Sequence, residues 1–223
     1  MAVLTTLLLV VSVLATVGLA QDRDDAVVFE GDQVRVLRVS LRPGESRTIQ
    51  DHQGAVLVSL TATLEGQIPP AEAAWYAAGT TTLDNRATRR FEGLWVGLRA
   101  PASGAPVPLP PEVAGWARSY GRRLADSTYG MTPTRVRTLV DNDQVLVSLH
   151  RLARSGLETE PPHLHPRDVV VVYLAGGEIT GSSAYLGTRH VRRGDVDVLP
   201  ANLVHAFRNL GNDLIEFVMI APK

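Results

Sequence analysis

Short stretches of alternating apolar and polar residues, separated by turns rich in Gly, Pro and Asp, follow one another along most of the chain. The clearest are residues 34–41, 55–64, 91–98, 135–140, 145–152, 169–174, 196–199 and 215–220. Alternation with a period of two indicates half-buried β-strands, and many short strands separated by turns are typical of a β-sandwich or β-barrel. The pattern therefore predicts an all-β protein.

One stretch departs from this alternation. Residues 169–174 read VVVVYL, with apolar side chains on both faces of the predicted strand. A continuous apolar run of this length indicates a strand buried on both sides. We expect a second sheet to cover one face, and a helix, a sister domain or another subunit to cover the other.

The middle of the chain has a different composition. Residues 101–130 are rich in Pro and Gly and end in a helix-like segment at 111–126, where Val113, Trp116, Tyr120 and Leu124 share one helical stripe. This segment predicts a linker with a short helix packed on a barrel. It divides the chain into a domain at 27–100 and a domain at 131–223.

The first 20 residues are apolar, carry no charged side chain and end before the polar sequence QDRDD. Gly18 and Ala20 stand where a signal peptidase needs small residues. Residues 1–20 are therefore interpreted as a cleaved signal peptide, or as an N-terminal membrane anchor if they are not cleaved. Either interpretation predicts an exported protein, periplasmic or secreted.

Composition excludes several classes of function. The chain has 22 Lys and Arg residues against 23 Asp and Glu residues, whereas a dedicated nucleic-acid binder normally has a basic excess. It has no cysteine, so disulfides, thiolate metal sites and thiol catalysis are excluded. Any bound metal must therefore use His, Asp, Glu or similar side chains.

The two halves of the chain resemble each other. The sequence RVSLRPG ends at Gly44 and HRLARSG ends at Gly156, and each precedes a turn and a hydrophobic strand. When these two glycines are aligned, Asp51 and Gln53 stand opposite His163 and His165, and Leu57 stands opposite Val169. A second alignment places Thr82 opposite His205. We interpret the chain as a duplicated module whose polar site is kept in the second copy only.

Three histidines in the second half are candidates for metal binding. His163 and His165 are two residues apart ahead of a strand, so in an extended chain both imidazoles lie on one face. His205 follows much later, after the turn that contains Gly194. Tyr173 has the same strand parity as the first two and is a candidate to line the pocket, although a core tyrosine is the alternative.

These residues resemble the two sequence motifs of the cupin superfamily. The first motif is matched by Gly156, His163, His165 and Gly176, and the second by Gly194, Pro200, His205 and Asn209, with Asn202 in place of its inner Gly. The resemblance implies two jelly-roll barrels of the double-stranded β-helix type, joined by the linker helix. It also implies that His163, His165 and His205 bind a divalent transition metal ion: Fe, Mn, Zn, Cu or Ni.

The resemblance is incomplete at the carboxylate ligand of the family, whose position holds Val169. Asp168 is adjacent, but strand alternation points it to the opposite face. Three neutral imidazoles leave the metal charge uncompensated, so open positions would suit water or an anionic oxygen ligand. Metal binding would be weaker than with a carboxylate, and it would be lost as the histidines become protonated.

Two functions follow from this resemblance. One is a metal-dependent oxygenase of a small enolic or catechol-like molecule, and the other is a non-catalytic exported module that binds a small molecule or a metal. A metal-free pocket that keeps the histidines as hydrogen-bonding groups, and a vestigial barrel, remain open alternatives. No general base is identifiable from the sequence. We expect a small-molecule partner, no nucleic acid, contact with a membrane only if residues 1–20 are not cleaved, and a monomer or a homodimer.

Overall fold

The computed structural model describes residues 26–61, 64, 72–99, 135–153, 164–181, 187–203 and 205–223. The predicted signal peptide, the predicted linker helix and the predicted domain boundaries near residues 100 and 131 lie outside these ranges. Within these ranges, no helix has the length and apolar character needed to cross a membrane.

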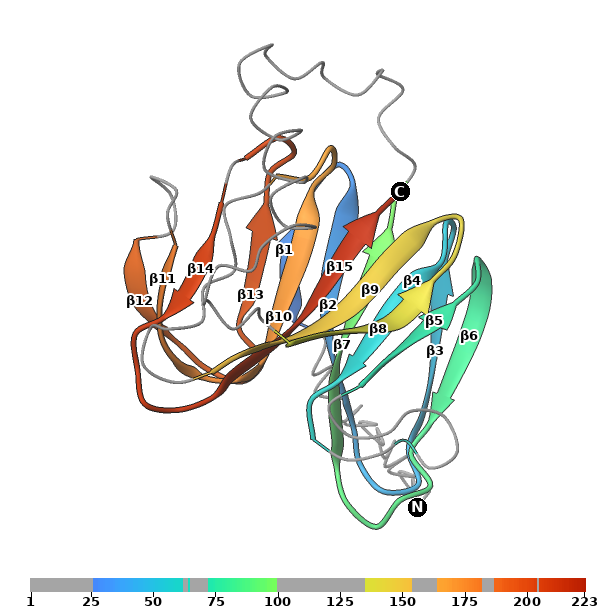
Figure 1. Cartoon of the computed structure of the whole chain (residues 1–223). Coiled ribbons are helices and arrows are strands. Elements are labelled where there is room, and N and C mark those ends of the chain that lie inside the picture. Colours follow the sequence, from blue (N-terminus) through green and yellow to red (C-terminus); the bar gives the residue numbers. More distant parts are fainter. Residues whose placement is uncertain are drawn as a thin grey trace, which may run out of the picture.

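The first module, residues 26–99, consists of two antiparallel sheets (Figure 1). Its large sheet has the strand order β1-β2-β7-β4-β5, and its small sheet pairs β3 with β6. The strands are β1 (Val27–Glu30), β2 (Val34–Leu41), β3 (Ser46–Asp51), β4 (Ala55–Ser59), β5 (Ala73–Tyr76), β6 (Gly79–Asp84) and β7 (Phe91–Leu98).

The second module, residues 135–223, repeats this plan. Its large sheet has the order β13-β10-β15-β9-β8, and its small sheet has the order β12-β11-β14. The strands are β8 (Arg135–Asp141), β9 (Val145–Leu152), β10 (Val169–Ala175), β11 (Gly177–Gly181), β12 (Thr188–Val191), β13 (Val196–Leu199), β14 (Phe207–Asn209) and β15 (Ile215–Pro222). The predicted all-β class with two jelly-roll barrels is confirmed.

The strands predicted from alternation agree closely with those of the structure. The bounds of β2, β7, β9 and β13 are the same, whereas the predicted stretch 55–64 is shorter in the structure and ends at Ser59. The short strands β1, β3, β5, β6, β11, β12 and β14 were not among the clearest sequence signals. Their side chains are mostly exposed or half-buried, so their hydrophobic pattern is weak.

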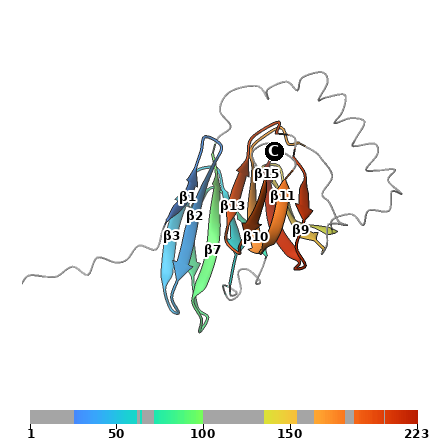
Figure 2. The ribbon, with the colours of Figure 1, turned by 90° about the vertical axis from the view of Figure 1, so that its left-hand side faces the viewer.

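Three hydrophobic cores hold the molecule together. One lies inside each barrel, and the third lies between the two large sheets, where Val56, Val58 and Leu94 of the first module pack with Val170 and Val172 of the second. Figure 2 shows the two modules as adjacent layers. This explains the run at 169–174, because alternate residues face the barrel interior and the sister module.

A buried asparagine occupies the same place in both modules and supports the duplication. The Asn85 amide donates hydrogen bonds to the carbonyls of Leu41 and Arg89, both at 2.8 Å. The Asn209 amide donates to the carbonyls of Leu152 at 3.1 Å and Asp213 at 2.6 Å. Each asparagine therefore ties the turn that follows β6 or β14 to the end of β2 or β9.

Candidate metal centre

The structure brings two of the three predicted histidines together. The ring centroids of His165 and His205 are 5.4 Å apart, with the ring planes inclined by 28°. His205 is buried, with 1% of its surface exposed, and His165 is half-buried. His163 lies outside the described residues.

Backbone hydrogen bonds fix the loops that carry these histidines. The N–H of Asn202 donates to the carbonyl of His165 at 2.7 Å, and the N–H of Ala201 donates to the Asp168 carboxylate at 2.9 Å. Asn202 has φ 62°, and the N–H of Leu203 bonds to the carbonyl of Pro200, as in a tight turn. Because asparagine adopts positive φ more readily than most residues, it can replace the glycine of the motif here.

The hydrogen bond of His205 determines its tautomer. Its Nδ1 lies 2.9 Å from the carbonyl oxygen of Leu203, which can only accept, so Nδ1 carries the proton. In the neutral ring, Nε2 then has the lone pair. A histidine ligand is commonly held in this way, with one nitrogen donating to a carbonyl and the other available to a metal.

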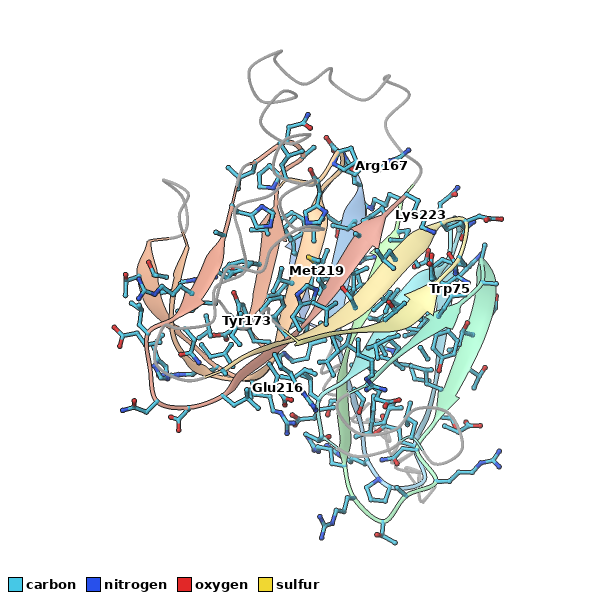
Figure 3. The ribbon with its side chains drawn as sticks, viewed as in Figure 1. Trp75, Arg167, Tyr173, Glu216, Met219 and Lys223 are labelled. Carbon is cyan, nitrogen blue, oxygen red and sulfur yellow. The ribbon has the colours of Figure 1, made fainter. Side chains whose placement is uncertain are left out.

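The two candidates to line the pocket are buried residues of the large sheet. Val169 and Tyr173 belong to the inner core of the second barrel, and Tyr173 is labelled in Figure 3. The Tyr173 hydroxyl donates to the Asp197 carboxylate at 2.8 Å, and the guanidinium of Arg189 binds the same carboxylate. Tyr173 is therefore an inner-wall residue whose hydroxyl is engaged within the fold.

The described residues provide no complete metal site. No group of three His, Asp or Glu side chains within the described ranges is close enough to hold an ion. Val169 is fully buried at the position of the carboxylate ligand, and the Asp168 side chain is occupied by the Ala201 N–H. A third ligand would have to come from outside these ranges, where His163 lies.

The sequence alone leaves the direction of the His150 side chain undetermined. The structure places it on β9 with 4% of its surface exposed, stacked on Phe217 with the ring centroids 4.9 Å apart. Its Nε2 lies 2.8 Å from the hydroxyl oxygen of Ser148, which is also buried. Strand alternation is the sequence signal for this direction. Every second residue of β9 faces the same side, so Ser148 and His150 face inward together with Leu152 of the inner core.

Strand registers revise the alignment of the two modules. Val96 pairs with Val36 and Val56, just as Ile220 pairs with Val147 and Val170. Val56 is therefore equivalent to Val170, and counting back along both segments places Ala55 opposite Val169 and Asp51 opposite His165. These residues replace Leu57 and Gln53 of the sequence alignment. The two buried asparagines set Thr81 rather than Thr82 opposite His205, because both stand four residues after those positions.

In the first module, the counterpart of His165 is a carboxylate that is hydrogen-bonded to an indole. The Nε1–H of Trp95 donates to Asp51 at 3.2 Å, and a Cβ at Gly97 would come within 2.3 Å of the same carboxylate oxygen. The ring of Tyr76 lies 5.2 Å from that of Trp95, and burial raises the pKa of Tyr76. The absence of histidines from these equivalent positions means that only the second module has the candidate metal centre.

Comparisons with known proteins agree with this architecture. The family model described as Cupin matches residues 134–222. Germin-like protein subfamily 2 member 2 of Arabidopsis thaliana is 34% identical over 94 residues, which are 40% of this chain and 43% of that protein. The chain thus spans about two fifths of the length of the curated relatives it matches.

Two solved structures share the fold over most of the chain. AerE from Microcystis aeruginosa has a TM-score of 0.62 at 12% identity, covering 92% of this chain and 95% of its own. A deletion mutant of oxalate decarboxylase from Bacillus subtilis has a TM-score of 0.57 at 14% identity, covering 88% of this chain and 71% of its own. At these identities the likeness concerns the fold alone.

Proposed function

Since the family model described as Cupin matches residues 134–222, which are the second module, we propose that this module binds one divalent transition metal ion through His163, His165 and His205. The observation that carries this proposal is the juxtaposition of the His165 and His205 rings, 5.4 Å apart, by loops that hydrogen-bond to each other. Two imidazoles converging from separate motifs are what a shared metal ion requires. Fe, Mn, Zn, Cu and Ni all accept such nitrogen ligands.

The residues present fit a metal ion. Imidazole is a suitable donor for these metals, and the Leu203 carbonyl holds His205 in the tautomer whose Nε2 is the donor. When bound, the ion would supply Lewis acidity or an O₂-binding centre. The chain's own contribution is to orient the imidazoles and, through Val169 and the aromatic inner wall, to exclude water from one side of the ligand.

The proposed reaction class is the oxygenation of a small organic molecule of enolic or catechol type. A site with neutral ligands favours an anionic oxygen ligand, because that ligand compensates the metal charge. The alternative is a non-catalytic module that binds a small molecule or a metal. It is favoured by the engagement of polar groups of the second barrel within the fold, since Tyr173 bonds to Asp197 and Asp168 bonds to the Ala201 N–H.

Export is part of the proposal. It rests on the uncharged, apolar character of residues 1–20 and on the small residues before Gln21. Expression of the full chain, followed by N-terminal sequencing of the protein outside the cytoplasm, would show cleavage after Ala20 or retention of the segment. Recovery of uncleaved protein in the cytoplasm would contradict export.

Metal analysis of the purified protein tests the main proposal. We expect about one transition metal ion per chain, reduced at least tenfold by His165→Ala or His205→Ala because each removes a ligand. The matched control is His190→Ala, which alters an exposed histidine of β12 and should leave the metal content unchanged. Protein that contains no metal, and takes up none when it is added, would overturn the proposal.

A further inference from the structure

Ser148 and His150 form a polar pair inside an otherwise apolar wall. Both lie on the face of β9 that points into the second barrel, and each has 4% of its surface exposed. The hydroxyl oxygen of Ser148 is 2.8 Å from Nε2 of His150, and Phe217 stacks under the imidazole. Replacing a buried hydrogen-bonded pair by apolar side chains of the same shape can be nearly neutral or stabilising, so folding alone does not explain the presence of this pair.

The first module shows that the fold does not need this pair. Strand registers set Leu37 opposite Ser148 and Val39 opposite His150, because Val36 and Val147 occupy equivalent positions in their ladders. Leu37 and Val39 are buried members of the hydrophobic core of the first barrel. The same two positions are therefore apolar in the module without metal-binding histidines and polar in the module with them.

The pair lies on the wall that leads to the histidines. Across the sheet, Ser148 pairs with Met219, and Met219 pairs with Val171. Val171 is the next inward-facing residue of β10 after Val169, so Ser148 lies one inward-facing position away from the row of Val169. His150 lies one inward-facing position further from Val169, in the row that it forms with Phe217 and Tyr173. Met219 and Tyr173 in Figure 3 mark the rows of Ser148 and His150.

Aromatic contacts connect the pair to the candidate metal centre. The ring centroids of His150 and Phe217 are 4.9 Å apart, those of Phe217 and Phe207 are 5.6 Å apart, and those of Phe207 and His205 are 5.7 Å apart. These contacts run from His150 on β9 through Phe217 on β15 and Phe207, the first residue of β14, to His205 just before that strand.

We propose that Ser148 and His150 recognise the organic ligand that binds at the metal centre. The Ser148 hydroxyl binds an oxygen atom of a small, hydroxylated, planar ligand held at the metal, and His150 positions that hydroxyl from behind. A serine hydroxyl has one donor and two acceptor sites, and His150 uses one of these, so the serine can also bind a ligand. This inference rests on the proposed function and adds the residues that select its ligand.

A catecholate probe tests this inference. 4-Nitrocatechol binds metal ions through two oxygens and changes its visible absorption when it does so, so its affinity for the metal-loaded protein can be measured directly. The variant is Ser148→Leu combined with His150→Val, which installs the residues of the first module. We expect unchanged metal content and 4-nitrocatechol affinity reduced at least about tenfold, equivalent to about 1.4 kcal/mol.

A conservative variant separates positioning from packing. His150→Gln keeps a side chain that can hydrogen-bond to Ser148, and we expect it to retain affinity within about threefold of the wild type. His150→Leu, of similar bulk but apolar, should lose affinity. If the double variant does not fold, Ser148→Ala alone gives the same answer, because it removes only the hydroxyl.

The outcomes are distinguishable. Metal-loaded variants that bind 4-nitrocatechol as tightly as the wild type would overturn the role of Ser148 and His150 while leaving the proposed metal site intact. Metal-loaded wild type that binds no 4-nitrocatechol would overturn the assigned ligand class. Wild type without metal would overturn the proposed function, and the inference with it.

Discussion

Val169 stands four residues after His165, on the inner wall of the second barrel, fully buried among apolar side chains. In the resemblance to the cupin motif, this is the position of the carboxylate ligand. An ion bound as proposed would have no acidic side chain at this position, and a single substitution can supply one.

We expect Val169→Glu to tighten metal binding by at least about tenfold, because an opposite charge near the ion contributes strongly in a buried site. Without metal, the same variant should be less stable than the wild type, because a buried carboxyl group replaces a packed valine. Competition with a chelator measures the affinity, and thermal unfolding with and without metal measures the stability. Val169→Gln is the control of equal size, and equal affinities of the Glu and Gln variants would contradict the prediction.

At the scale of elements, the turns after β6 and β14 depend on one buried asparagine each. Asn209 donates to two carbonyls and accepts from the N–H of Gly211 at 2.9 Å, while Asn85 accepts from Ala87 at 3.2 Å. Alanine at either position removes these bonds and leaves buried carbonyls without a donor. Because each buried unsatisfied group costs about 1–3 kcal/mol, we expect Asn209→Ala and Asn85→Ala each to lower the free energy of unfolding by about 2–4 kcal/mol.

Urea unfolding measures these losses. Asn142→Ala is a suitable control, because the Asn142 side chain accepts from the N–H groups of Gln144 and Val145 in the half-exposed turn before β9, where water can replace it. We expect this change to cost less than about 1 kcal/mol. Losses of equal size in all three variants would contradict the special role of the two buried turns.

Alternation predicted the strands of the two large sheets, because their residues face either a barrel core or the sister module. It did not reveal strands such as β6, whose sequence GTTTLD buries only Leu83. A single offset could not align the modules throughout, because loops of different length change the offset from element to element. Strand pairing resolved this, and it identified Asp51 as the counterpart of His165.

The proximity of His165 and His205 was predictable, because the motifs fix both residue type and spacing. The burial of Ser148 and His150 inside the barrel was not predicted, because it depends on which face of β9 lines the barrel. That face is set by pairing with β15, the last strand of the chain. Long-range pairing is therefore the information that the local sequence pattern lacks.

At the scale of the whole molecule, the two modules share one apolar interface. Leu174 of the second module and Leu94 of the first belong to the same core between the large sheets. Polar contacts lie around it: the guanidinium of Arg38 donates to the carbonyl of Gly194 at 3.0 Å, and Arg137 pairs with Glu72 at 3.0 Å. A core shared in this way should make the modules unfold together.

The tryptophans allow this coupling to be measured. Trp75 and Trp95 lie in β5 and β7, so in a Trp116→Phe background the tryptophan fluorescence comes from the first module alone. Leu174→Ala removes a buried side chain from the second module and should cost about 2–5 kcal/mol. If the modules unfold as one unit, the tryptophan fluorescence midpoint in urea falls by the same amount as the midpoint from circular dichroism. The opposite outcome is that Leu174→Ala leaves the fluorescence midpoint unchanged while circular dichroism shows two separate transitions. That outcome would show that the shared core does not couple the modules.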